Sequence, residues 1–260
     1  MKRMLGSLRF GFRELVVSPA IALAVAMALL GVLRGGLIHW EAVGPASLEA
    51  SAGAAALAAC QDSSEEEERK KARAQEVARI AELLGLEAGM VVADLGAGDG
   101  SLAVELAAHV GEGGMVLANE VVPMLVKKME SRFRTAGFHE KNLSALLGNQ
   151  QDTGLQADCC DAILVRLVYH HFTDRPAMIS SLRRSLKPTG LIAVIETKKS
   201  PGNWHSYAQD QLIQEMEEGG FQLVTRFEDW GRDMNFKVLE GKVLHCSLFR
   251  KAEERAREGL

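Results

Sequence analysis

Cysteine is scarce in this chain, and positive charge is not in excess. The 260 residues contain four cysteines, which lack the paired spacing of a zinc site and are too few for a disulfide framework in a chain this long. The 30 Lys and Arg are outnumbered by 34 Asp and Glu, for a formal net charge of −4. Without a basic stripe to offset phosphate repulsion, nucleic acid is not an expected partner. The cysteines are interpreted as buried or free thiols: Cys60, Cys159, Cys160 and Cys246.

Charged residues are absent from one long segment near the start. Residues 15–33, LVVSPAIALAVAMALLGVL, form an apolar run about long enough to cross a bilayer as a helix. The basic segment 1–14 precedes this run. Between the end of the run and Arg69, the one Lys or Arg residue is Arg34. The positive-inside rule therefore predicts a single-pass membrane anchor with the following domain on the extracytoplasmic side. The stretch 34–62, rich in Ala, Gly and Ser, is predicted to be a linker.

Three alternatives for the N-terminal segment stay open. A cleaved signal peptide is one, although its apolar stretch is usually shorter than residues 15–33. Residues 57–60, LAAC, resemble a bacterial lipoprotein cleavage box, but they lie far from the start. The early arginines and the lack of acids before Glu14 resemble a mitochondrial presequence. The N-terminal sequence is therefore compatible with export or mitochondrial targeting as well as with an uncleaved anchor.

A globular domain is predicted over 63–250, followed by a charged tail at 251–260. Ser63 or Ser64 can cap a helix that opens with four glutamates, and apolar residues at helical spacing continue it to Leu84. Beyond it, apolar strands alternate with helices, which indicates an α/β fold with a doubly wound parallel sheet covered on both faces. The strands are predicted at 91–95, 115–119, 143–147, 162–165 and 191–195, and the helices near 101–109, 123–136 and 175–186.

A glycine-rich turn joins the strand at 91–95 to the helix at 101–109. Its pattern, from Gly96 to Gly100, is G-x-G-x-G instead of the G-x-G-x-x-G of dinucleotide-binding turns, and Asp94 precedes it by two residues. Glycines let the backbone approach a ligand, and free N–H groups at a helix start offer donors. Glu120 ends the next strand about 20 residues later, where an acidic side chain meets ribose hydroxyls. Together these elements predict a nucleotide-type site with Glu120 on the ribose.

Three motifs, VVADLGAGDG, VLANEVVPML and SLKPTGLIAVIE, resemble in sequence and order those of the class I S-adenosylmethionine-dependent methyltransferases. The resemblance covers about residues 72–250. It implies S-adenosyl-L-methionine as cofactor, and two antiparallel closing strands, 221–227 and 242–249, that complete a mostly parallel seven-stranded sheet. By this resemblance Asn149 stands where relatives usually carry an acid that contacts the adenine amine. The residues assigned to the cofactor are Asp94, Gly96, Ala97, Gly98, Gly100, Glu120, Asn149 and Arg166.

The methyl acceptor is expected beside the string YHHF, which follows the fourth strand at the carboxyl edge of the sheet. The string is similar to one in a branch of the family with membrane-linked or exported members. Tyr169, His170 and His171 are the catalytic candidates, since an imidazole can remove a proton from the acceptor near neutral pH. The alternative is structural: one histidine bonds a backbone carbonyl while the aromatic rings pack. No metal is expected, because the sequence suggests no third ligand. Glu196 is a candidate to assist a base, and His205 is a weaker candidate.

The expected function is methyl transfer to a small-molecule or lipid-like acceptor by a membrane-anchored enzyme. A sulfonium is already an activated leaving group, so the absence of a clear catalytic dyad does not argue against activity. Two alternatives stay open. One is methylation of a protein side chain in a membrane-resident partner, favoured by the high local concentration that a tether gives. The other is a scaffold that binds the cofactor without catalysis.

Overall fold

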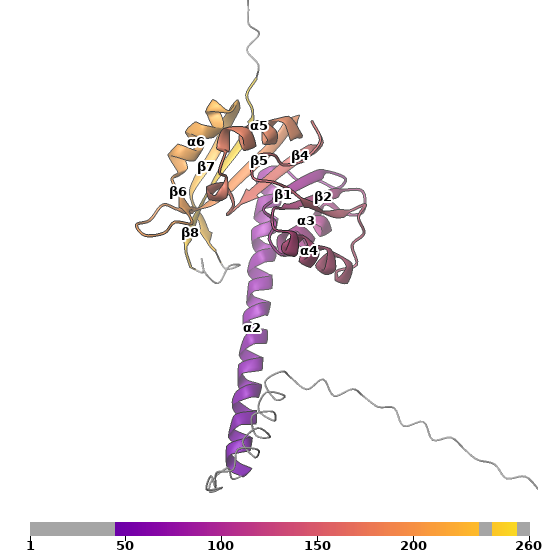
Figure 1. Ribbon diagram of the computed structural model, residues 1–260, viewed down its shortest axis with the longest axis vertical. Helices are drawn as coiled ribbons and strands as arrows, with labels where there is room; N and C mark the ends of the chain where they lie inside the picture. The colour runs from indigo at the N-terminus through magenta and orange to yellow at the C-terminus, as the bar shows by residue number, and fades with distance from the viewer. Residues whose placement is uncertain (1–44, 234–240, 254–260) are drawn as a thin grey trace, which may run out of the picture. The chain divides into compact units, whose positions relative to one another are not determined.

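The computed structural model describes residues 45–233 and 241–253. The chain divides into two compact units, Met1–Ala59 and Cys60–Leu260, and every described strand belongs to the second. Figure 1 shows the second unit as a sheet with helices packed on it. Its start at Cys60 lies close to the domain start predicted at residue 63.

The first described helix, α2, runs from Pro45 to Leu84, so the prediction that a helix starts at Ser63 or Ser64 is wrong. Both serines lie inside the helix. Alanine, the strongest helix former, is abundant between residues 45 and 62, and its intrinsic preference sustains a helix that has no apolar stripe there. The stripe predicted near the end of the helix is confirmed, because the apolar residues at 77, 80, 81 and 84 are buried in the core.

The predicted membrane anchor, residues 15–33, lies outside the residues that the structure describes, as does the basic segment 1–14. Within 45–233 and 241–253, no helix is both long and apolar enough to cross a bilayer. The anchor and its orientation therefore stay predictions. Most of the charged tail, from residue 254 onward, also lies outside the described part of the chain.

The sheet has the strand order β3-β2-β1-β4-β5-β8-β7, and the short β6 pairs with β5. Strands β1 to β5 pair in parallel, whereas β8 runs antiparallel to both of its neighbours, β5 and β7. This confirms the mostly parallel sheet with its closing hairpin at one edge. The strands are β1 Val91–Leu95, β2 Met115–Glu120, β3 Leu143–Leu147, β4 Cys160–Arg166, β5 Leu186–Lys198, β6 Ser206–Tyr207, β7 Phe221–Arg232 and β8 Val243–Lys251.

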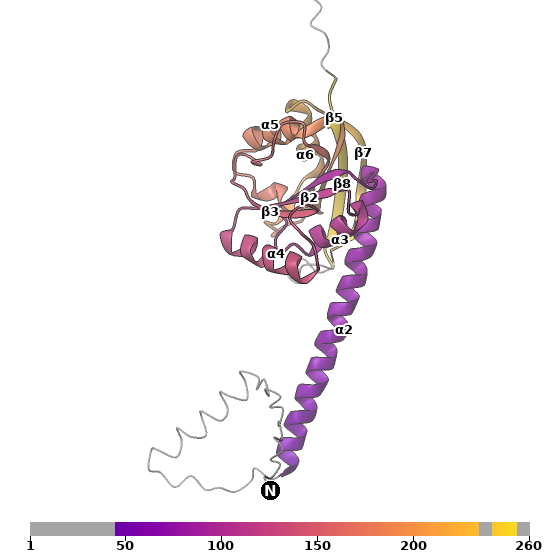
Figure 2. The ribbon, with the colours of Figure 1, turned by 90° about the vertical axis from the view of Figure 1, so that its right-hand side faces the viewer.

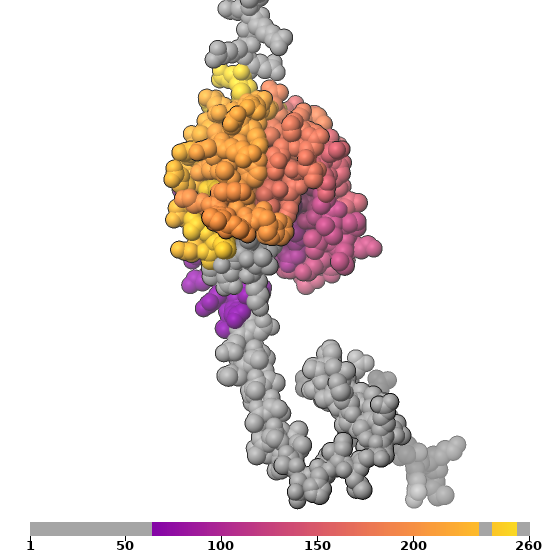
Figure 3. All heavy atoms as spheres, turned by 60° about the vertical axis from the view of Figure 1, so that its left-hand side comes forward, coloured from indigo at the N-terminus to yellow at the C-terminus, as the bar shows by residue number. Residues whose placement is uncertain are grey.

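Two apolar layers hold the helices against the sheet. One joins the end of α2 to α3 and α4 on one face, and the other joins α5 and α6 to the opposite face, as the turned ribbon shows (Figure 2). In the space-filling view the orange segments, which include α6, form a continuous face of the domain (Figure 3). The helices on the sheet are α3 Ser101–Val110, α4 Pro123–Thr135, α5 Arg175–Ser185 and α6 Gln209–Glu218.

The strand order reverses direction between the neighbouring strands β1 and β4. After β1 the chain moves outward to β2 and β3, and after β4 it moves the other way to β5. In doubly wound sheets the crevice outside the carboxyl ends of the strands at such a point is the usual ligand site. The loops after β1, β2, β4 and β5 therefore meet at the edge where the predicted cofactor and acceptor residues lie.

Candidate active site

In the glycine loop after β1, one glycine is closely packed and another faces open space. Gly96 has a φ of +68°, and a Cβ atom there would lie 2.5 Å from Cγ2 of Val168, which lies two residues before the histidine pair. Gly98 has a φ of +59°, and a Cβ atom there would meet nothing within 4 Å. Gly96 therefore lets the loops after β1 and β4 touch, whereas Gly98 presents bare backbone to open space, as the approach of a ligand requires.

Asp94, near the end of β1, is a buried carboxyl group with an unpartnered oxygen. It is 2% exposed, and its Oδ2 accepts no hydrogen bond from any described residue. Burial is the main cause that raises the pKa of Asp94, to about 7. The charge of Arg166 lowers this pKa and the charge of Glu120 raises it, each by less than burial does. A buried polar atom without a partner is rare in proteins and calls for a specific explanation. A ligand that brings a cationic donor to Asp94 supplies one.

Glu120, at the end of β2, connects its strand to the glycine loop. The backbone N–H of Gly98 donates to Oε2 at 3.1 Å, while those of Val121 and Val122 donate to Oε1 at 2.7 and 3.1 Å. Ala97 is held to the same strand, because its N–H donates to the carbonyl of Asn119 at 2.9 Å. The predicted ribose acid and the glycine loop therefore form one continuous structure.

Arg166, at the end of β4, holds other elements together. Its guanidinium donates to both carboxylate oxygens of Glu76, at 2.8 and 2.9 Å, and to Asp233 at 2.7 Å, and its side chain is 5% exposed. It thus ties β4 to α2 and to the residue that follows β7. Direct contact between Arg166 and the cofactor stays a prediction, but its charge already acts on Asp94.

Asn149 follows β3 and shapes a turn. Its Oδ1 accepts hydrogen bonds from the N–H groups of Gln151 and Asp152, at 2.8 and 2.7 Å. An Asn side chain that bonds the backbone two residues on is a common turn-forming device. The geometry accounts for an Asn at this position without a ligand, and the adenine contact stays a prediction.

Tyr169 opens a short 3-10 helix, η1 (Tyr169–His171), and is completely buried. Its hydroxyl donates to Glu215 on α6 at 2.8 Å, and its ring packs against Phe172 and Tyr207, each with centroids 5.3 Å away. Burial, followed by the nearby Glu215 carboxylate, raises the pKa of the hydroxyl above its ordinary value. These contacts favour the packing role over the catalytic one for Tyr169.

His170 is held from behind by an acid. Its Nδ1 lies 2.9 Å from Oε2 and 3.1 Å from Oε1 of Glu196, and its backbone N–H donates to Oε1 at 3.2 Å. Glu196, near the end of β5, is wholly buried. On the other side of the ring, Nε2 of His170 lies 3.2 Å from Nδ1 of His205. An acid that orients an imidazole in this way is the arrangement expected of a working histidine.

His171 and His205 complete a cluster that the sequence did not reveal. The His171 ring centroid lies 4.0 Å from that of His170, and the rings of Trp204 and His205, tilted by 34°, have centroids 3.3 Å apart. Burial, followed by the charge of His170, lowers the pKa of both His171 and His205. The sequence suggests no third ligand beside the histidine pair, but the structure brings His205 there on the loop after β5. The parallel neighbours β4 and β5 bring the loops that follow them to one edge of the sheet, but this adjacency does not single out His205.

A family model described as a methyltransferase domain matches residues 86–241, more than half of the chain. The chain belongs to this family. It carries a methyltransferase domain, as the resemblance of its motifs implied. This assignment explains three features of the fold: the strand order, the glycine loop and the acid at the end of β2.

Curated relatives cover part of this methyltransferase. The ubiquinone/menaquinone biosynthesis C-methyltransferase UbiE of Pectobacterium carotovorum subsp. carotovorum is 29% identical over 118 residues, which are 45% of this chain and 47% of the relative. UbiE of Shewanella sp. strain ANA-3 is 30% identical over the same length and the same shares. The chain thus spans about half the length of the curated relatives that it matches.

Solved structures share the fold of the methyltransferase at low sequence identity. A SAM-dependent methyltransferase from Aquifex aeolicus superposes with a TM-score of 0.59 at 23% identity, over 68% of this chain and 89% of the other. The YcgJ protein from Bacillus subtilis gives 0.53 at 13% identity, over 69% and 99%. These likenesses extend to the fold and not to the acceptor.

The residues of the site fit the cofactor of this class. When bound, S-adenosylmethionine supplies a methyl group on a positively charged sulfur, and it also carries an ammonium group and ribose hydroxyls as donors. Asp94 offers an unpartnered buried carboxylate oxygen, Gly98 offers open backbone, and Glu120 offers a carboxylate beside that backbone. The chain's own task is then to place the acceptor and to handle its proton.

Proposed function

We propose that the methyltransferase transfers its methyl group to a small, apolar or lipid-like acceptor at the carboxyl edge of the sheet. Asp94 and the loop from Gly96 to Gly100 hold the aminoacyl part of the cofactor, Glu120 holds the ribose, and Asn149 borders the adenine. The acceptor approaches from the side of the histidine pair. The observation that carries this proposal is the apolar rim around that edge.

Most of the large apolar side chains exposed in the described part of the chain gather at this edge. They are Val121, Val122, Met124, Leu147 and Trp204, with Val224 on β7 the sole member elsewhere. Trp204, which is 74% exposed, lies beside the histidines, and the other four lie at the ends of β2 and β3 near Glu120. Exposed apolar side chains that gather around a polar site mark a binding surface. They suit an acceptor whose body is apolar and whose reacting atom is polar.

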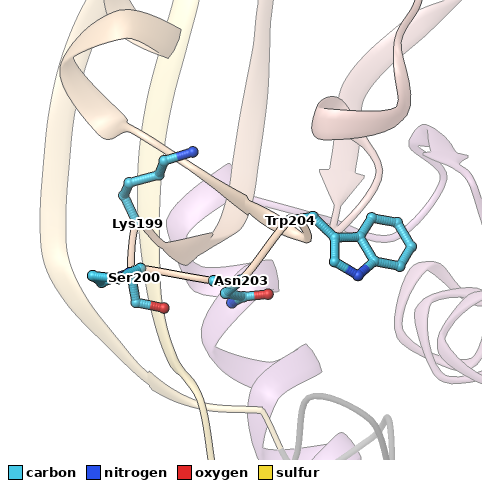
Figure 4. A pocket seen from close by; sticks show the side chains of 6 residues that line it. Lys199, Ser200, Asn203 and Trp204 are labelled. Atoms are coloured by element: carbon cyan, nitrogen blue, oxygen red, sulfur yellow. The ribbon is translucent and has the colours of Figure 1, made fainter.

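The loop that carries Trp204 also lines a shallow hollow. Residues 199–204 line a space of about 510 Å³. Figure 4 shows the indole of Trp204 on the opposite side of this loop from Lys199. The indole therefore faces away from Lys199 and is available to the acceptor side, where it contacts the ring of His205.

The chemistry on the acceptor side rests on His170. Because Glu196 bonds Nδ1, the Nε2 atom of His170, which lies 3.2 Å from Nδ1 of His205, is the one that can take a proton from an acceptor hydroxyl or an acidic carbon. His171 borders the same position, with the charge of Glu120 acting on it from the cofactor side. Most of the rate enhancement is expected from alignment of acceptor and methyl group, with the base adding to it.

The N-terminal run at 15–33 is part of the proposal, as a membrane anchor that brings the domain to lipid-like acceptors. Its support is its length and lack of charge. Replacing Leu23 and Val25 by Arg should release the full chain from membranes that resist an alkaline wash. Release of the unsubstituted chain by the same wash would contradict the anchor and leave the methyltransferase assignment untouched.

The acceptor class can be tested with methyl-labelled cofactor and cell extracts separated into organic and aqueous fractions. We expect label to enter the organic fraction. The variant Trp204→Ser should lower that incorporation, whereas Val224→Ser, which changes an exposed apolar residue on β7, should not. Label that enters only protein would instead support side-chain methylation of a membrane partner, and equal loss in both variants would contradict the role of the rim.

A further inference from the structure

Three histidines bring their ring nitrogens together at the acceptor edge. His170 and His171 come from η1, and His205 comes from the loop after β5, 34 residues beyond His171. One ligating nitrogen from each lies within 4.8 Å of the others. The Nε2 of His170 and the Nδ1 of His205 are 3.2 Å apart, close to the separation of about 3.3 Å that two nitrogens have on one tetrahedral zinc ion with bonds of about 2.0 Å.

A second, independent feature lies behind the cluster. The wholly buried Glu196 bonds Nδ1 of His170, and the same carboxylate accepts the backbone N–H of that residue. Histidines that bind metals almost always give their other ring nitrogen to a carboxylate or carbonyl, which fixes the tautomer and orients the ring. With Nδ1 bonded to Glu196, the lone pair of His170 lies on Nε2, toward His205.

We propose that His170, His171 and His205 bind one zinc ion beside the cofactor site. Three imidazoles with a fourth position left open are the ligand set of a catalytic zinc, and imidazole is a ligand that this ion favours. The exposed His171 completes the set by a small rotation of its side chain, since its nitrogen is already within reach. The fourth position is open to water or to an anionic oxygen or sulfur of the acceptor.

This inference rests on the proposed function, because it names the chemical class of the acceptor at the same site. An acceptor that binds the ion through a hydroxyl or thiol is held at a fixed point next to the methyl donor and gives up its proton more readily. With zinc bound, the ion takes over the activation of the acceptor, because the Nε2 lone pair of His170 is then a ligand and no longer a base. Trp204, whose ring contacts that of His205, offers an apolar surface beside that point. The acceptor that fits both features is an apolar molecule bearing an ionisable hydroxyl or thiol.

The test is zinc binding by calorimetry to the purified full chain, stripped with a chelator beforehand. We expect one tight site. His205→Ala, on a loop, should weaken zinc binding by about a hundredfold or more, and Glu196→Gln by about ten- to a hundredfold. The matched control is His139→Ala, since this histidine lies away from the cluster. Thermal melting of each variant without zinc should show that it is folded.

Cobalt in place of zinc reports the geometry of the same site. We expect the strong visible absorption of tetrahedral cobalt, and a shift of that spectrum on addition of azide if the fourth position is open. Equal zinc binding in the parent chain and in His205→Ala, or no zinc binding in a folded parent chain, would overturn the proposal. S-adenosylmethionine binding is measured on the same samples. If it persists while zinc binding fails, the zinc site alone is contradicted; if it fails too, the proposed function falls.

Discussion

Replacing Asp94 by Asn should make the cofactor-free protein more stable at neutral and alkaline pH. Burial raises the pKa of Asp94 from an ordinary 3.8 to about 7. The native carboxyl therefore holds its proton more tightly than the unfolded one, so its ionisation lowers the unfolding free energy. This loss is nil below about pH 4, grows as pH rises, and is complete above about pH 7. At about 1.4 kcal/mol per pH unit, the full cost is roughly 4 kcal/mol.

The gain from the Asp94→Asn substitution is smaller than this cost, because a buried amide without partners carries a penalty of its own, about 1–3 kcal/mol. We therefore expect Asp94→Asn to raise the unfolding free energy by roughly 2 kcal/mol at about pH 8, and to give no gain at about pH 4.5. Urea unfolding of the full chain without cofactor measures both. The variant should at the same time lose cofactor affinity, since the ammonium loses its charged partner.

The matched control is Asp161→Asn. Burial raises the pKa of Asp161, but the hydrogen bonds from Lys187 and from the N–H of Val91 outweigh it, so the net shift is downward. This variant should be less stable than the parent at about pH 8, the opposite of Asp94→Asn. A gain from Asp94→Asn that is equal at both pH values, or a loss at about pH 8, would refute the account of Asp94.

Three further predictions concern the frame of the site. Gly98→Ala should cost only about 1 kcal/mol of stability, through its positive φ, but should weaken cofactor binding by more than tenfold in calorimetry, since its Cβ enters the open space. Tyr169→Phe should lower the melting temperature slightly, for a loss of about 1 kcal/mol, and leave kcat within about threefold; a large loss of kcat alone would restore the catalytic role. Arg166→Met should cost about 3–5 kcal/mol in urea unfolding, because it removes the cation that pairs with the buried Asp233 and the part-buried Glu76; a stable variant would contradict the bracing role.

The short buried strands could be predicted from the sequence because their apolar runs are bounded by clear turn signals. Strands β1 and β3 have the predicted bounds. Strand β5 begins at Leu186 instead of the predicted residue 191, since Pro188 and Gly190 suggest a turn. The structure accommodates them with an irregular register between β4 and β5. Local propensity here yields to pairing with a neighbouring strand.

The cofactor side of the site could be predicted because its residues are local to one turn and one strand end. The acceptor side could not, because it depends on contacts between residues far apart in the chain. His205 reaches His170 across 35 positions, and Glu215 reaches Tyr169 across 46. No periodicity encodes such a pair, so the third histidine and the packing role of Tyr169 needed the structure.

Calorimetry of the full chain with S-adenosylmethionine, S-adenosylhomocysteine and NAD tests the central claim most directly. We expect micromolar binding of the two adenosyl sulfur compounds, no binding of NAD, and loss of binding in Glu120→Ala. A folded protein that binds none of the three, or that binds NAD in their place, would contradict it.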